Sequence, residues 1–229
     1  MGLRERKKQQ TRQLIADTAW RLFADRGFER VTVAEVAREA QVAEATVFNY
    51  LRTKEDLFYV RLEAFGARLV DAVAARDPGE PALAAFRRVL LDGGGLLAQV
   101  EAGDPGALER LRTVNRLIDA SPALLARERQ AIAGATDTLA ALLAAETGAP
   151  DGDVRPQVAA NALMGVQQAL IEHVRRRVLA GERPSGLPAE VRELAEQAFN
   201  LLEDGLGGYA AAPDGPERDA GNRGWASGM

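Results

Sequence analysis

The sequence predicts an all-α protein in which a small N-terminal domain of three helices is joined by a helix to a larger helical domain. Two observations lead to this fold class. Apolar residues recur at intervals of three and four over most of the chain between Leu14 and Leu206, which is the spacing of one helix face. Pro or Gly separates successive apolar stretches, and no strand pattern lies between the helices of the larger domain.

The first expected helix spans Thr11 to Arg26 and ends at Gly27, since glycine tolerates the left-handed geometry of a helix end. A basic arm precedes it. The arm comprises Arg4, Arg6, Lys7, Lys8 and Arg12. Such an arm is either a solvated, frayed terminus or an electrostatic contact for phosphates, and the residues that follow favour the second reading.

Two short helices separated by a tight turn come next. Thr32 and Glu35 stand three residues apart before an apolar run, so each side chain can satisfy a free backbone N–H at a helix start. We expect helices over 33–40 and 44–50, with Val42 as an apolar plug in the turn between them. Val47 faces inward on the second helix. The outward residues are Ala45, Thr46, Phe48 and Asn49. A hydroxyl, an amide and an aromatic ring near a helix N-terminus suit phosphate and base-edge contacts in a major groove of DNA.

A third cap starts the helix that links the two domains. Thr53 and Asp56 repeat the capping pattern, so we expect a helix from Lys54 to Val73. Lys54 lies at its N-terminus, where it could meet a phosphate. We further expect that this helix alone lines the larger domain and touches the smaller one, so that a displacement of its far end is delivered to the smaller domain.

The N-terminal pattern resembles the DNA-binding domain of TetR-family transcriptional regulators over about Thr11 to Leu57. The matching residues are Gly27, Thr32, Val42, the run Thr46 to Leu51, and Lys54 with Glu55. The chain departs from the family pattern at Gln41, Ala43 and Ala45, where Gly, Ser and Gly are usual, so the usual Ser cap with its phosphate contact is missing. The resemblance and the outward face together assign the following residues to DNA contact: Thr32, Ala43, Glu44, Ala45, Thr46, Phe48, Asn49, Tyr50, Lys54, Lys7 and Lys8.

The larger domain is expected to hold five further helices. They span about 81–91, 104–118, 121–148, 154–180 and 187–206. The run Gly93 to Gly95 is either a simple break or a deformable wall of a ligand pocket. Asp104-Pro105 and Ser121-Pro122 combine a cap with a first-turn proline, which starts a helix.

The larger domain resembles, more weakly, the C-terminal domain of actinobacterial TetR regulators grouped with those that bind acyl-CoA-like ligands. The resemblance lies in SPALLARERQ from Ser121, LAALLAAETGAP from Leu139 and VAANALMGVQQA from Val158. It implies an effector pocket for an apolar or acyl-type molecule. The expected pocket residues are Phe65, Leu69, Phe86, Leu90, Asn115, Leu117, Met164 and Gln168. An amide such as Asn115 or Gln168 on an apolar face either binds a neighbouring backbone or faces a ligand.

The last two helices are expected to pair with their copies about a two-fold axis in a four-helix bundle. The expected dimer contacts are Ala162, Val166, Ala169, His173, Leu194, Ala198 and Leu201. His173 is either a hydrogen-bonded interface residue or a pH sensor. The run Arg175 to Arg177 is either a solvated face or a site for an anionic ligand.

Charge is divided unevenly along the chain. Residues 1 to 54 hold eleven Lys or Arg against seven Asp or Glu, and the remainder holds eighteen against twenty-six, so charges of +4 and −8 make up the net −4. A basic head on an acidic body fits contact with nucleic acid. There is no Cys and one His, which leaves few ligands for a metal site. With no membrane-length apolar run and no visible export signal, we expect a soluble, cytoplasmic protein without membrane contact.

These features predict a ligand-responsive homodimeric transcriptional repressor that binds a palindromic operator in double-stranded DNA and is released by a small molecule. We expect no cofactor and no bound metal. One alternative is an architectural DNA-binding protein without an effector, which a dry, fully packed body would favour over a body with a cavity. An enzyme is disfavoured, because the chain has no Gly-rich phosphate loop and no paired nucleophile and base. We expect three regions: a helix-turn-helix domain over 1–53, an effector-binding and dimerisation domain over 54–209, and a disordered tail over 210–229.

Overall fold

The computed structural model describes residues 3–59, 64–180 and 186–206, and only the backbone of 3–5, 64, 65, 204 and 206. Within these ranges the chain forms eleven α-helices and no strand. The expected all-α fold class is confirmed. The first four are α1 (Leu3–Arg26), α2 (Val33–Glu39), α3 (Glu44–Tyr50) and α4 (Lys54–Tyr59). The others are α5 (Ala64–Ala74), α6 (Ala82–Leu91), α7 (Gly95–Glu101), α8 (Ala107–Asp119), α9 (Pro122–Thr147), α10 (Arg155–Leu179) and α11 (Leu187–Leu206). None of the described helices is long and apolar enough to cross a membrane.

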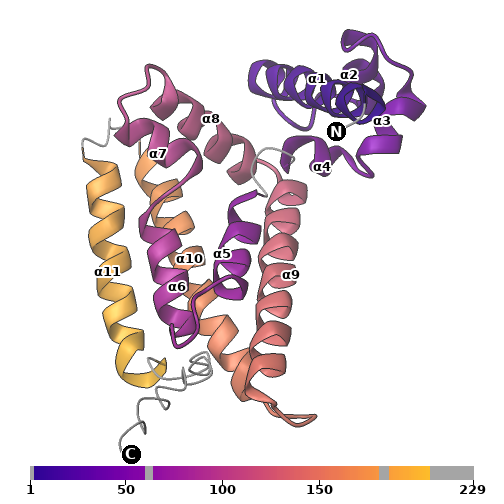
Figure 1. Cartoon of the computed structure of the whole chain (residues 1–229). Coiled ribbons are helices and arrows are strands. Elements are labelled where there is room, and N and C mark those ends of the chain that lie inside the picture. Colours follow the sequence, from indigo (N-terminus) through magenta and orange to yellow (C-terminus); the bar gives the residue numbers. More distant parts are fainter. Residues whose placement is uncertain (1–2, 60–63, 181–185, 207–229) are drawn as a thin grey trace, which may run out of the picture.

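Helices α1 to α4 form a small N-terminal domain (Figure 1). Aromatic side chains are prominent in its core. The rings of Phe23 and Phe28 lie 5.0 Å apart between centroids, and Phe58 of α4 packs edge-on against Phe28 at 6.2 Å. Such offset and edge-to-face pairs add to the stability that apolar burial gives. Because Phe58 and its neighbour Leu57 are buried in this core, α4 packs as part of the N-terminal domain.

Two expected capping pairs of the N-terminal domain are confirmed. The Thr32 hydroxyl accepts from the Glu35 N–H, and the Glu35 carboxylate accepts from the Thr32 N–H, which makes a reciprocal capping box. Thr53 and Asp56 make the same pair of bonds at the start of α4. Ala43 caps α3 without any side-chain bond.

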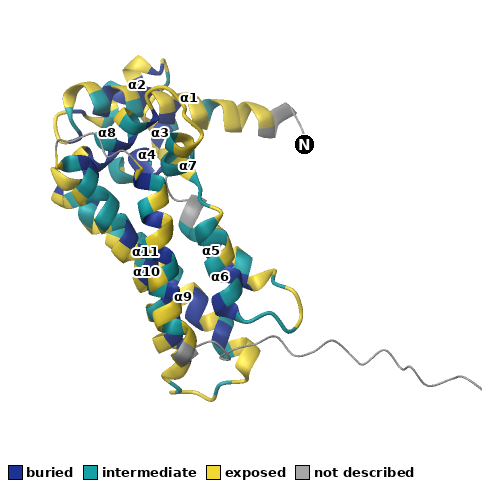
Figure 2. Ribbon diagram, turned by 90° about the vertical axis from the view of Figure 1, so that its left-hand side faces the viewer, coloured by how far each residue is buried: buried dark blue, intermediate teal, exposed yellow. Residues whose placement is uncertain are grey.

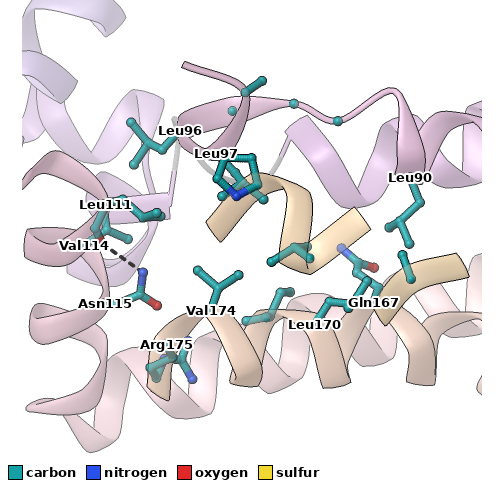
Figure 3. A pocket seen from close by; sticks show the side chains of 18 of the residues that line it. Leu90, Leu96, Leu97, Leu111, Val114, Asn115, Gln167, Leu170, Val174 and Arg175 are labelled. Carbon is teal, nitrogen blue, oxygen red and sulfur yellow. Dashed lines mark hydrogen bonds between the residues drawn. The ribbon is translucent and has the colours of Figure 1, made fainter. Parts of the chain in front are cut away.

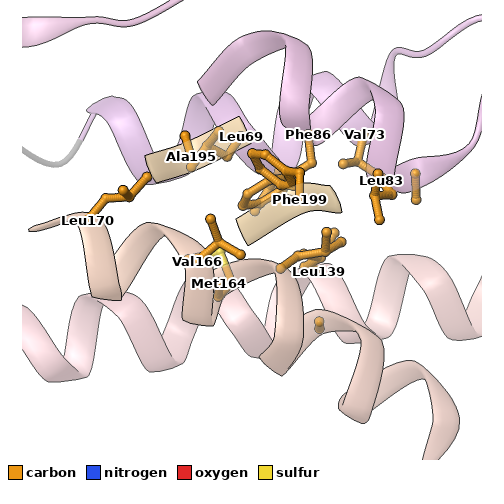
Figure 4. Packing of buried hydrophobic residues seen from close by; sticks show 14 of the residues in the cluster. Leu69, Val73, Leu83, Phe86, Leu139, Met164, Val166, Leu170, Ala195 and Phe199 are labelled. Atoms are coloured by element: carbon orange, nitrogen blue, oxygen red, sulfur yellow. The ribbon is translucent and has the colours of Figure 1, made fainter. Parts of the chain in front are cut away.

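Helices α5 to α11 form the larger domain, whose core lies around α10. Buried side chains of α5, α6, α9, α10 and α11 meet there, including Leu69, Phe86, Leu139, Met164 and Phe199 (Figure 4). The rings of Phe86 and Phe199 pack at 6.2 Å in an edge-on arrangement. This core joins helices that are far apart in the sequence.

Two expected helix starts are wrong, and one helix of the structure was not expected. The basic arm is not separate from the first helix, because α1 begins at Leu3 and includes it. The break at Gly93 to Gly95 leads directly into α7, a helix that the apolar spacing does not predict. Helix α8 begins at Ala107 after Gly106 in a left-handed conformation, two residues beyond Pro105. The expected helix from Lys54 to Val73 corresponds to α4 and α5, and residues 60–63 between them lie outside the described residues.

The two domains touch through more than the linking helix. Val114, Leu117 and Ile118 of α8 and Leu124 of α9 are buried in the same cluster as the N-terminal core. Figure 1 shows the end of α8 and the start of α9 beside α4. The expectation that the helix from Lys54 alone touches both domains is therefore wrong: α8 and α9 also form the domain contact.

Candidate DNA-binding surface and effector cavity

Helix α3 presents an exposed face that its own domain does not use. Val47 is 1% exposed and holds the helix on the core, whereas Phe48 is 47% exposed. Asn49 and Ala45 are also exposed, and Thr46 is partly exposed. An exposed aromatic ring next to an exposed amide adds nothing to this core. The face therefore offers hydrogen-bonding and apolar groups to an external partner such as base edges in a groove.

Two residues assigned to DNA contact have partners within the N-terminal domain. The Thr32 hydroxyl is part of the capping box. The Glu35 carboxylate accepts hydrogen bonds from the Thr32 backbone N–H and from the Thr32 hydroxyl, and these bonds, the backbone one first, hold the pKa of Glu35 below its usual range. The ammonium of Lys54 lies 4.2 Å from the centroid of the Phe28 ring, and its Nζ is 3.4 Å from the Glu29 carbonyl oxygen. In this geometry both side chains stabilise the loop between α1 and α2.

The remaining residues assigned to DNA contact lie at the surface. Glu44 and Ala43 are exposed at the start of α3, and Tyr50 at its end is partly exposed. Lys7 and Lys8 are exposed on the first turns of α1, which projects beyond the rest of the domain (Figure 2). Because this stretch is helical, its cations are held at a fixed spacing along a stiff rod.

A cavity of about 340 Å³ lies in the larger domain next to the N-terminal domain. Figure 3 shows its wall, to which α7, α8, α10 and α11 contribute, and Tyr59 of α4 also reaches it. Most of the wall is apolar. Its apolar members include Leu90, Leu96, Leu97, Leu111, Val114, Ile118, Leu170, Ile171, Val174 and Val191. A cavity of this size and character is typical of small-molecule sites.

Gln167 and Asn115 in the wall are buried, and the side chain of Arg175 is 11% exposed. Gln167 is 5% exposed, and its Oε1 has no hydrogen-bond partner among the described residues. Asn115 donates from Nδ2 to the Leu111 carbonyl oxygen at 2.8 Å. Arg175 donates from one Nη to both carboxylate oxygens of Glu128, at 2.6 and 2.9 Å, while its buried Nε has no partner in the same part of the chain.

The expected pocket residues lie in different parts of the structure. Leu90 and Asn115 line the cavity. Leu69, Phe86 and Met164 belong to the closed core, and Leu117 belongs to the core shared by the two domains. Gln168 is exposed and lines a separate polar hollow between α9 and α10. The side chain of Phe65 lies outside the described residues.

Two polar residues of the cavity were not identified from the sequence. The sequence pattern points to Gln168 instead of its neighbour Gln167, and Arg175 stands out only as one member of a charged run. A signal existed for Gln167, because it lies three residues before Leu170 and therefore on the same helix face. The run Gly93 to Gly95 also lines the cavity, so it is both a helix break and part of a wall.

The residues assigned to the dimer interface differ in how far they are exposed. Leu201 is 80% exposed and Ala169 is exposed. Ala162, Leu194 and Ala198 are partly exposed. Val166 is buried in the core of its own chain and cannot contribute a surface contact without repacking. His173 bonds to Glu190 at 2.9 Å and ties α10 to α11. Burial opposes ionisation of Glu190, but the His173 bond and the Arg177 charge outweigh it and lower the pKa of Glu190.

Comparisons with known proteins match both domains. Residues 15–59 match the family of bacterial regulatory proteins called tetR, and residues 94–207 match the MftR C-terminal domain. The transcriptional regulator TcmR of Streptomyces glaucescens is 32% identical over 162 residues, which cover 68% of this chain and 69% of TcmR. MftR of Mycobacterium tuberculosis is 27% identical over 175 residues, covering 73% of this chain and 81% of MftR.

Solved structures share the fold. NalD, the secondary repressor of the MexAB-OprM multidrug efflux pump in Pseudomonas aeruginosa, has a TM-score of 0.52 at 20% identity and covers 85% of this chain and 96% of NalD. The SmeT–triclosan complex has a TM-score of 0.51 at 17% identity, covering 90% of this chain and 97% of SmeT. With its N-terminal helix-turn-helix, its helical C-terminal domain and a sequence that follows TcmR over two thirds of both proteins, the chain belongs to the TetR family of transcriptional regulators, with a C-terminal domain of the MftR type.

Proposed function

We propose that this regulator is a homodimeric repressor that binds a palindromic operator through α3 and is released when a largely apolar small molecule enters the cavity. One observation carries the proposal. Tyr59, Val114 and Ile118 line the cavity and are at the same time buried in the core that includes the N-terminal domain. A molecule in the cavity therefore presses on side chains that also position the DNA-binding helices.

The first turns of α9 supply a second route between cavity and DNA. Ser121 at the N-cap donates to the Glu29 carboxylate, and the Leu124 carbonyl accepts from the Tyr59 hydroxyl at 3.0 Å. Arg127 bonds to Asp56 at 3.2 Å. The next residue, Glu128, reaches the cavity through Arg175. Since helices move as stiff units, a displacement of α9 would carry the N-terminal domain with it.

The cavity favours a sensor over an architectural protein without an effector. A packed body would have supported the architectural reading, but an apolar space next to the domain contact has no evident use in a purely structural role. The related fold of SmeT was solved with triclosan, which fits a small-molecule site in this fold. For this chain, an apolar or acyl-type effector remains the proposed class.

The outer face of α10 and α11 is the proposed dimer surface. His173 meets Glu190, and the two helices are antiparallel, so Ala162 and Leu201, each eleven residues further from that contact, lie at the same level. Small residues on α10 and an exposed leucine on α11 allow close approach of two more helices. We expect Leu201→Glu to shift the protein from dimer to monomer in sedimentation equilibrium at micromolar concentration, whereas exposed Asn200→Glu, the adjacent control, should leave it dimeric.

The operator test uses the DNA upstream of the protein's own gene. Footprinting should reveal a protected palindrome, and the dimer should contact its two halves in successive major grooves or at a multiple of that spacing. Scrambling one half should weaken binding sharply. Unchanged affinity after scrambling would refute symmetric readout.

The switch is tested by filling the cavity. Val174→Trp places an indole among the lining residues and should abolish the binding of an apolar probe such as N-phenyl-1-naphthylamine. Any small molecule that lowers operator affinity tenfold must itself bind about tenfold more weakly to the operator complex, because coupling between two sites is reciprocal. If a small molecule bound in the cavity has the same affinity for the free protein and for the operator complex, release through this cavity is excluded.

A further inference from the structure

At each end of the cavity lies a polar group that has no partner among the described residues, and apolar groups lie between the two ends. Gln167 and Arg175 are eight residues apart on α10, which separates them by about 12 Å along the helix axis. Leu170, Ile171 and Val174 line the wall between them. In Figure 3 Arg175 and Asn115 lie at one end of the cavity, and Gln167 lies toward the other end.

The two ends lack hydrogen bonds that buried groups normally make. Oε1 of Gln167 and Nε of Arg175 are buried without a partner in the described part of the chain. Leaving such groups unsatisfied is costly, whereas a ligand that supplies the missing partners recovers that cost. The side-chain amide can present oxygen or nitrogen, so a hydroxyl suits it because a hydroxyl both donates and accepts.

The charge at the Arg175 end is already balanced. Glu128 receives two hydrogen bonds from Arg175, and the two side chains are only 16% and 11% exposed. A carboxylate on the ligand would bring a second anion to the same guanidinium and be repelled by Glu128. Other charged residues of the wall lie toward solvent: Arg192 pairs with Glu101 at 2.5 Å, and Arg68 is exposed.

From this pattern we propose that the effector is an uncharged, elongated, mainly apolar molecule with a hydrogen-bonding oxygen at each end, one at Gln167 and the other at Nε of Arg175. The inference rests on the proposed function, because it names the chemical class that the cavity would take. It excludes simple fatty acids, whose single carboxylate would meet Glu128 and whose other end has no polar atom for Gln167.

Rigid stilbene probes test this class. We would displace N-phenyl-1-naphthylamine from the full-length protein with trans-4,4′-dihydroxystilbene, trans-4-hydroxystilbene and trans-stilbene-4,4′-dicarboxylate. The diol should bind about three to ten times more tightly than the single phenol, since one net hydrogen bond is worth that factor. The dicarboxylate should bind at least tenfold more weakly than the diol.

Matched variants locate the two ends. Gln167→Leu should remove the advantage of the diol over the single phenol, and Gln167→Met serves if the first variant folds poorly. Gln168→Leu, its exposed neighbour, should leave that advantage unchanged. Arg175→Lys keeps a cation for Glu128 but removes Nε, so it should also remove the advantage.

The outcomes distinguish two failures. A protein that does not bind the naphthylamine probe, or binds it equally well in the Val174→Trp variant, would refute the proposed function. If the probe is bound in the cavity, the inference on ligand class is overturned by any of three results: no displacement by either phenol, a dicarboxylate as tight as the diol, or an advantage of the diol that survives Gln167→Leu.

Discussion

Substituting one inward and one outward residue of α3 by alanine separates the role of this helix in folding from its role in DNA binding. Val47 is 1% exposed and lies in the N-terminal core. Val47→Ala removes two buried methyl groups, which costs about 2 kcal/mol of unfolding free energy when the small cavity left behind is included. For a chain of this length the midpoint of thermal unfolding should fall by roughly 4 to 8 °C.

Asn49→Ala should weaken operator binding and leave the stability of the fold nearly unchanged. Its side chain is exposed, so the unfolding free energy should change by less than about 0.5 kcal/mol. A well-placed contact between an amide and a base is worth about 1 to 3 kcal/mol. Two half-sites in a dimer double this loss, so operator affinity should fall at least roughly thirtyfold.

The assay is fluorescence anisotropy at one fixed salt concentration with a labelled operator duplex and a random duplex of equal length. Thermal unfolding of both variants is measured in parallel. The assignment of α3 as the reading helix would be refuted if Asn49→Ala weakened operator and random DNA equally. It would also fail if Asn49→Ala lowered the unfolding midpoint as much as Val47→Ala does.

Three further predictions follow from the N-terminal domain. Replacing Lys7 and Lys8 by Gln removes four cations from a dimer and should reduce the slope of log affinity against log salt by up to about 3 to 4, with operator and random DNA affected alike; an unchanged slope would place these lysines away from phosphates. Ala43 is an N-cap in extended conformation without a side-chain bond, so Ala43→Ser should raise the unfolding free energy by about 0.5 to 1 kcal/mol in denaturant titration, and a loss of stability would contradict this geometry. Because its bonds with Thr32 lower the pKa of Glu35 below the usual 4.5, the stabilisation from its ionised form is complete above that value and is lost as pH falls through the lower folded pKa. The stability of the wild type relative to Glu35→Gln should therefore be greatest near neutral pH and decrease in acid. If melting curves show the same difference between the two proteins at every pH, the ionised Glu35 does not stabilise the fold in this way.

Local features of the fold could be predicted from the sequence because a few neighbouring residues encode them. The capping pairs Thr32 with Glu35 and Thr53 with Asp56 are found in the structure as expected. Ser121 and Pro122 start α9 as expected. In each case the cap donors and acceptors are three residues apart, so no distant contact is needed to form the bond.

The N-terminal end of α1 is a helix boundary that apolar periodicity does not predict. The sequence suggested an arm ahead of a helix at Thr11, but α1 begins at Leu3. Basic residues such as Lys7 are good helix formers, and a polar stretch continues a helix without adding an apolar face. Apolar periodicity marks where a helix packs, whereas its end can extend beyond the packed part.

Tertiary structure decided which side chains reach the cavity. Gln167 and Gln168 look equivalent in the sequence, but neighbouring positions on a helix point about 100° apart. The rotation of α10 against α8 and α11 buries Gln167 in the cavity wall and leaves Gln168 exposed. Arg175 is drawn inward by Glu128, which lies 47 residues earlier on α9.

The contact between the domains was also a product of tertiary packing. The sequence determined that a capped helix-turn-helix precedes a set of amphipathic helices, since caps and apolar spacing are local. It could not determine that Leu124 and Ile118 would be buried together with Phe58 in a single core. Such contacts depend on how whole helices cross, and a helix face reveals that it will be covered without revealing which other helix will cover it.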